Sequence, residues 1–97
     1  MEKRFRVVFS PPAGRDMEKL EVDTALQLAR DFKTYLEKSP FPIGKTRIKK
    51  LTNFEPPLFR IRSGDFRAYY RIVSSEVVIL AVTHKKDSEK WLRKIKR

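Results

Sequence analysis

Hydrophobic and polar residues alternate with a period of two along several short segments, which is the pattern of half-buried β-strands. Residues 3–9, KRFRVVF, place Phe5, Val7 and Phe9 on one face. Residues 58–62 and 66–72 alternate in the same way. Residues 77–82 form an unbroken apolar run rich in β-branched side chains, which predicts a central strand covered on both faces.

Helical spacing of apolar residues predicts three helices. Ser10 can cap a short helix that begins at Pro11 and runs to about Leu20. Residues 22–38 form an amphipathic helix, which the Ser39-Pro40-Phe41-Pro42 segment ends because proline cannot continue the hydrogen-bond ladder. A last helix begins near Asp87 or Ser88 and carries Trp91, Leu92 and Ile95. The apolar stripe of the longest helix comprises Val22, Ala25, Leu26, Ala29, Phe32 and Leu36.

The resulting order is β-α-α-β-β-β-α, with the structure of the basic stretch KTRIKKL at residues 45–51 left open. This order predicts a single α+β domain spanning residues 1–97. We expect a small sandwich in which an N-terminal helical hairpin packs on the apolar face of a mostly antiparallel sheet.

The other face of this sheet carries arginines at alternate positions of two adjacent strands. Arg60 and Arg62 share one face of their strand, and Arg67 and Arg71 share one face of the next with Tyr69. We call this predicted surface the arginine face and expect it to be open.

The hairpin between these strands fixes their register. Ser63-Gly64-Asp65-Phe66 is typical of a two-residue turn with glycine at a position of positive φ. This turn would put Arg62 opposite Arg67, Arg60 opposite Tyr69, and Ile61 opposite Ala68. Opposed like charges cost a few tenths to about 1 kcal/mol, so an anionic partner such as phosphate is expected. A solvated outer face without a partner is the alternative.

Charge is distributed unevenly along the chain. Residues 1–44 carry 8 basic and 7 acidic side chains, whereas residues 45–97 carry 15 basic and 5 acidic ones. Nearly all of the net charge of +11 therefore lies in the half that contains the arginine hairpin. Nucleic acid is the first candidate partner and an acidic protein the second. A membrane surface is disfavoured because the basic residues lie on strands.

Composition excludes several other classes of function. The chain has no cysteine, which excludes disulfides, a thiol nucleophile and a zinc–thiolate site. The N-terminal segment lacks an apolar core of signal-peptide length, and no apolar run approaches the roughly 20 residues of a membrane span. We therefore expect a cytoplasmic protein.

The segments LFRIRSGDFRAYYRI and VVILAVTHKKD resemble the RelE/ParE superfamily of bacterial and archaeal toxins from toxin–antitoxin pairs. KKLTNFEPPLFRIRSGDFR is especially similar to the pattern of that family, and the order of elements agrees over nearly the whole chain. The resemblance implies one of two activities. RelE-type toxins cleave mRNA in the ribosomal A site without a metal or other cofactor, whereas ParE-type toxins inhibit DNA gyrase, and an antitoxin silences both.

The resemblance also implies roles for particular residues. Arg60 and Arg62 occupy the positions where RelE-type toxins present basic residues, and Arg67 matches the arginine that stabilises the transition state. Lys85 aligns with a basic residue after the last strand. His84 resembles a histidine of some nuclease members, and histidine ordinarily titrates near neutrality, so we expect it to act as acid or base. The residues expected to contact RNA are Tyr69, Arg71, Lys86, Trp91, Lys49 and Lys50.

Trp91 falls where many RelE-type toxins have a tyrosine. Tryptophan cannot exchange a proton, so Trp91 would either stack on a base or pack against the sheet. We favour a ribosome-dependent, metal-independent mRNA endonuclease. A gyrase inhibitor and an inactive nucleic-acid-binding relative are the alternatives.

Overall fold

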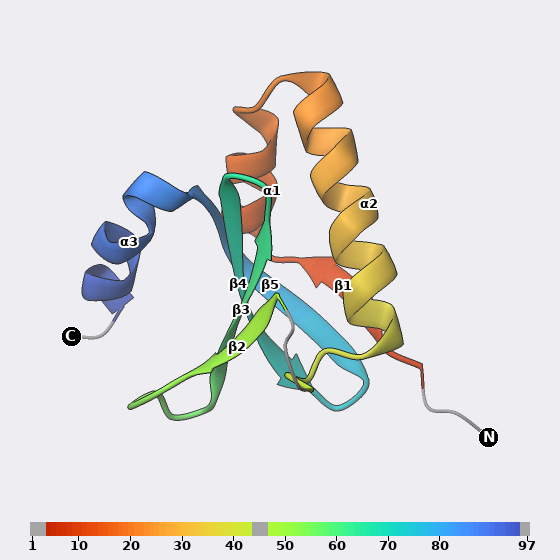
Figure 1. Ribbon diagram of the computed structural model, residues 1–97, viewed down its shortest axis with the longest axis vertical. Helices are drawn as coiled ribbons and strands as arrows, with labels where there is room; N and C mark the ends of the chain where they lie inside the picture. Colours follow the sequence, from red (N-terminus) through yellow and green to blue (C-terminus); the bar gives the residue numbers. More distant parts are fainter. Residues whose placement is uncertain (1–3, 44–46, 96–97) are drawn as a thin grey trace.

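The computed structural model describes residues 4–43 and 47–95. Four helical segments and five strands follow one another along these residues (Figure 1). In chain order they are β1 (Arg6–Phe9), α1 (Pro11–Glu18), α2 (Val22–Lys38), β2 (Ile48–Leu51), β3 (Leu58–Ser63), β4 (Phe66–Val73), β5 (Glu76–His84), η1 (Lys85–Asp87) and α3 (Ser88–Ile95). The predicted α+β class is confirmed.

The strands form one sheet in the order β1-β5-β4-β3-β2. β1 pairs in parallel with β5, and the other neighbouring pairs are antiparallel. β5 is therefore an inner strand, as its apolar run predicts. Helices α1 and α2 lie together over one face of the sheet, and α3 lies apart from them at the end of the chain (Figure 1).

β2 is the strand that the sequence left open. Ile48 pairs with Ile61 and Lys49 with Arg60, which makes β2 an edge strand beside β3. The expectation for residues 45 and 46 lies outside the described residues, as does that for Lys3 at the start of the predicted first strand, and β1 itself begins at Arg6.

The first two helices begin as predicted. The Ser10 hydroxyl accepts a hydrogen bond from the Ala13 backbone N–H, and proline occupies the first helical turn. The predicted apolar stripe of α2 is wrong at its N-terminal end, since Val22 is 72% and Leu26 51% exposed. Phe32 and Leu36 are buried as predicted, and Leu28 forms a row with them because residues four apart lie on the same side of a helix.

The core lies between this row and the inner face of the sheet. Ile61, Ala68, Tyr70, Val77 and Ile79 are each fully buried there. Tyr70 stacks on Phe59 with ring centroids 5.5 Å apart, and its hydroxyl donates to the Pro40 carbonyl over 2.7 Å. Burial raises the pKa of the Tyr70 hydroxyl above its ordinary value.

An irregularity in β5 changes which residues face outward. Tyr69 pairs with Ala81 but Tyr70 pairs with Ile79, so Leu80 is an extra residue of the kind found in a β-bulge. α1 lies along β5 beyond the end of β1, where an Asp16 carboxylate oxygen accepts the Val82 backbone N–H over 2.9 Å. The bulge at Leu80 thus reverses which face of the sheet each later residue of β5 points to.

No helix within the described ranges is long and apolar enough to cross a membrane.

Candidate functional site

The β3–β4 hairpin has the register that the turn predicts. Arg62 lies opposite Arg67, Arg60 opposite Tyr69, and Ile61 opposite Ala68. Gly64 has a φ of 58°, and the next residue does not have positive φ, which is the pattern of a type II′ turn. Because opposed residues of paired strands share a face, Arg60, Arg62 and Arg67 come together on the arginine face.

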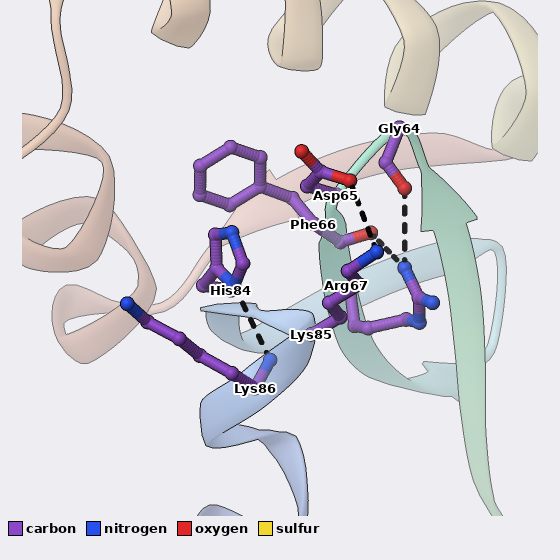
Figure 2. Close-up of polar contacts among 7 residues, drawn as sticks. All are labelled: Gly64, Asp65, Phe66, Arg67, His84, Lys85 and Lys86. Carbon is purple, nitrogen blue, oxygen red and sulfur yellow. Dashed lines mark hydrogen bonds and ion pairs between the residues drawn. The ribbon is translucent and has the colours of Figure 1, made fainter.

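Arg67 is held at the turn end of this face. Its Nη1 donates to the Gly64 carbonyl over 3.3 Å and to the Phe66 carbonyl over 3.1 Å (Figure 2). Burial lowers the pKa of Arg67, and the positive charges of Arg60 and Arg62 lower it further. Arginine remains charged at neutral pH despite such a shift. The mutual repulsion of these side chains means that binding an anion here would be favourable.

Two arginine nitrogens on this face are buried without a partner. The Nε atoms of Arg60 and Arg71 have no hydrogen bond to any of the described residues. An unmade hydrogen bond of a buried donor costs about 1–3 kcal/mol, and both nitrogens are enclosed by protein atoms, so a ligand does not reach them in this arrangement. Among these residues the ion pairs are Arg6–Glu76 and Lys85–Asp65, and neither involves an arginine of the hairpin.

The structure does not place His84 with the arginines. His84 lies opposite Phe66, and their rings meet edge to face with centroids 5.4 Å apart (Figure 2). Its Nδ1 accepts the Lys86 backbone N–H over 3.2 Å and so caps η1. The extra residue in β5 is the physical reason, because it turns Thr83 toward Arg67 and His84 toward the opposite face. His84, which was expected to act as acid or base beside Arg60, Arg62 and Arg67, therefore lies on the other face of the sheet from them.

Thr83 is the residue that sequence reasoning missed at this place. It pairs with Arg67, and its hydroxyl lies 2.8 Å from the hydroxyl of Ser88 at the start of α3. No signal in the sequence marks the bulge that exposes it on the arginine face.

The two lysines after β5 occupy different surroundings. Lys85 joins the hairpin turn, with its Nζ 3.4 Å from an Asp65 carboxylate oxygen and its backbone N–H bonded to the Asp65 carbonyl (Figure 2). Lys86 is exposed beside it. On the edge strand, Lys49 lies opposite Arg60 and extends the arginine face, whereas the next residue, Lys50, points to the other face.

α3 covers the middle of the arginine face, which is therefore not fully open as expected. Trp91 stacks on Tyr69 with ring centroids 4.6 Å apart and an interplanar angle of 23°. Tyr69 is only 1% exposed as a result. Of the two expected roles of Trp91, packing against the sheet is the one seen in this arrangement. Tyr69 is not accessible to a base unless Trp91 moves.

The described residues contain no cluster of three or more His, Asp or Glu side chains that could hold a metal ion. The distinctive chemistry of this surface is instead a group of guanidinium ions on a rigid hairpin, which suits the binding of phosphate.

Comparisons with known proteins match this chain to toxins of toxin–antitoxin systems. A family model described as the ParE toxin of type II toxin–antitoxin systems, parDE, matches residues 7–89. A chain of the toxin–antitoxin complex RelBE2 from Mycobacterium tuberculosis is 30% identical, with a TM-score of 0.64 over 84% of this chain and 98% of that chain. A comparison with curated proteins finds no match.

Two further solved structures share the fold at lower identity. A chain of the RelE–RelB complex from Pyrococcus horikoshii is 24% identical, with a TM-score of 0.68 over 84% of this chain and 96% of that chain. A mutant of the Escherichia coli toxin RelE in the free state is 19% identical, with a TM-score of 0.61 over 97% of both chains.

Proposed function

This chain belongs to the ParE toxin family of type II toxin–antitoxin systems, and we propose that it is an mRNA endonuclease of the RelE type, which its similarity to a chain of the RelBE2 complex supports. It would inhibit translation by cutting mRNA on the ribosome. The observation that carries the proposal is the convergence of Arg60, Arg62 and Arg67 on one face, with no ion pair to any of them among the described residues.

The proposed reaction is attack of a ribose 2′-oxygen on the adjacent phosphorus, with departure of the 5′-oxygen and formation of a cyclic phosphate. The pentacoordinate transition state carries more negative charge than the starting phosphodiester. Arg67, held by the turn carbonyls, and Arg62 opposite it would stabilise that added charge. The charge of the nearby Arg60 guanidinium would add to this stabilisation.

Proton transfer is assigned outside the arginines, because a guanidinium is a poor proton acceptor at neutral pH. The neighbours that the register gives Arg67 on this face are Arg62 and Thr83, and neither type ordinarily acts as a base near neutrality. We propose that charge stabilisation is the main contribution of this chain, that the 2′-proton passes to water or to the ribosome, and that the departing 5′-oxygen takes a proton from water to become a hydroxyl. His84 remains the alternative acceptor.

Replacing Arg67 tests this function. Arg67→Ala should lower single-turnover cleavage of mRNA on translating ribosomes by about 10²–10³-fold, the loss typical of removing one donor to a developing charge. The matched control is Arg15→Ala, since Arg15 is exposed on α1, away from the hairpin. Cleavage by Arg67→Ala at the rate of Arg15→Ala would remove Arg67 from the proposed role.

Inhibition of DNA gyrase is the second candidate, favoured by the description of the matching family model and by the position of His84 away from the arginine face. A supercoiling assay separates the two. Potent inhibition of gyrase without any mRNA cleavage would replace the first proposal with the second.

A further inference from the structure

A pair of hydroxyl groups lies beside Arg67, on the side of β4 away from Arg62. Thr83 of β5 is opposite Arg67, and the Cβ atoms of opposed residues in an antiparallel pair are about 4.5–5.5 Å apart. The Thr83 hydroxyl lies 2.8 Å from the hydroxyl of Ser88 at the start of α3. Arg67 therefore has a basic neighbour on one adjacent strand and a hydroxyl neighbour on the other.

The hydroxyl pair has one proton that is free to donate. Two hydroxyl groups carry two protons, and only one proton can lie between the two oxygens. Within residues 4–43 and 47–95, neither hydroxyl has another hydrogen-bond partner. With Ser88 as the donor of the pair, the Thr83 hydroxyl keeps its own proton for an acceptor on the arginine face. Thr83 is partly exposed, so a ligand can reach it.

Contacts of α1 with the bulge help to hold Thr83 on the arginine face. The Ser10 hydroxyl donates to the Leu80 carbonyl over 3.4 Å. An Asp16 carboxylate oxygen accepts the Val82 backbone N–H over 2.9 Å. These two hydrogen bonds fix the backbone at and after the extra residue that reverses the alternation of β5. The position of Thr83 is thus supported by α1 as well as by the contact with α3.

We infer that the Thr83 hydroxyl is a further RNA-binding group, which donates a hydrogen bond to a non-bridging oxygen of the phosphate that Arg67 binds. The inference rests on the proposed function, which supplies RNA as the ligand. A phosphodiester has two non-bridging oxygens, so it can accept from a guanidinium and a hydroxyl together. The hydroxyl adds a donor without adding charge and therefore does not increase the repulsion among the arginines.

A purely structural role for the hydroxyl pair leads to a different prediction. In that role the pair attaches α3 to β5, and loss of either hydroxyl would loosen α3 to the same degree. Trp91 reports on α3 directly, because it is the single tryptophan of the chain and stacks on Tyr69. Its fluorescence therefore shows whether α3 stays in place in each variant.

The test measures the affinity of the purified toxin for a labelled single-stranded RNA oligonucleotide with 2′-O-methyl sugars, by fluorescence anisotropy. The methyl group blocks attack by the 2′-oxygen, so binding is measured without cleavage. Thr83→Val removes the hydroxyl and keeps the shape of the side chain, whereas Thr83→Ser keeps the hydroxyl. Ser88→Ala is the matched control, because it breaks the same hydroxyl pair and leaves the Thr83 hydroxyl in place.

Thr83→Val should bind the oligonucleotide about tenfold or more weakly than wild type, the loss typical of one hydrogen bond to a charged group. Thr83→Ser should restore most of the affinity, and Ser88→Ala should lose much less than Thr83→Val. Because threonine is uncharged, Thr83→Val should keep the wild-type dependence of affinity on salt. Arg67→Ala should instead lower the slope of log affinity against log salt by about 1, since one phosphate contact is lost.

Equal losses in Thr83→Val and Ser88→Ala, with altered Trp91 fluorescence in both, would overturn the inference and assign the pair to the attachment of α3. Wild-type affinity of Thr83→Val would also overturn it. Arg67→Ala separates this failure from failure of the proposed function. A loss in Arg67→Ala alone would remove Thr83 from the site and keep the arginine face, whereas no loss in Arg67→Ala would contradict phosphate binding at Arg67 and overturn both proposals.

Discussion

Arg62→Gln should stabilise the fold while it weakens the function. Arg62 is exposed and lies directly opposite Arg67, and its charge adds to the effects of burial and of Arg60 in lowering the pKa of Arg67. The substitution removes that charge and keeps a polar side chain that can lie along the strand. Positive charges that are close enough to bind one anion repel each other in its absence. The substitution should therefore raise the stability of the free protein and lower its affinity for RNA.

The magnitude follows from the cross-strand geometry. Like charges directly opposite in a sheet cost about 0.2–1 kcal/mol, and this repulsion is lost in the variant. For a domain of this size that gain corresponds to a rise in melting temperature of about 1–8 °C. A charged hydrogen bond to phosphate contributes about 1.5–3 kcal/mol, so RNA affinity should fall by roughly 10- to 150-fold.

The assay compares thermal unfolding by circular dichroism at low and high salt. Salt screens exposed charges, so the stabilisation by Arg62→Gln should be largest at low salt and shrink as salt is added. Arg6→Gln is the matched control, because Arg6 forms an exposed ion pair with Glu76 on the same sheet. Its melting temperature should stay level or fall slightly, since such pairs contribute about 0–1 kcal/mol.

A lower melting temperature for Arg62→Gln would refute the reasoning, because it would mean that Arg62 is already compensated within the fold. Unchanged RNA affinity would refute the predicted loss of function, since it would show that Arg62 of the arginine face does not bind phosphate.

Three further substitutions test the elements that support the site. In urea unfolding, Asp16→Ala should lower the free energy of unfolding by about 1–3 kcal/mol, because the Val82 N–H loses its acceptor. Asp16→Asn should lower it less. Equal decreases for the two variants would contradict the hydrogen-bond account. Tyr70→Phe should be less stable than wild type at neutral pH, where the Pro40 carbonyl loses its donor. Since burial raises the pKa of Tyr70, the folded state disfavours its ionisation, and the stability gap should narrow as pH rises above about 10; a constant gap would argue against this. His84→Gln should leave the pH profile of single-turnover cleavage unchanged near neutrality, and a flattened profile would restore His84 as acid or base.

Much of the fold could be predicted because its signals are local. The alternation in β3 and β4 and the Gly64-Asp65 turn determine which residues lie opposite each other, and the register of Arg62 and Arg67 follows from them. The proline segment after α2 and the cap at Ser10 mark helix ends in the same local way.

The sequence predictions were wrong or open where contacts between distant parts of the chain determine the structure. The extra residue at Leu80 reverses the faces of Thr83 and His84, and nothing in the sequence of β5 marks it. The stack of Trp91 on Tyr69 depends on how α3 returns to the sheet, so the sequence left packing and base stacking equally open. The register of the hairpin was therefore predicted correctly, whereas the face of His84 at the end of β5 was not.

The most direct test of the central claim is the chemistry of mRNA ends after expression of the toxin. Wild type should leave 2′,3′-cyclic phosphate and 5′-hydroxyl ends on translated mRNA, and purified toxin should do so on ribosomes in the presence of a metal chelator, whereas Arg67→Ala should leave neither. Ends with 3′-hydroxyl and 5′-phosphate groups, or no cuts together with inhibited gyrase, would contradict the claim that the arginine face cleaves mRNA.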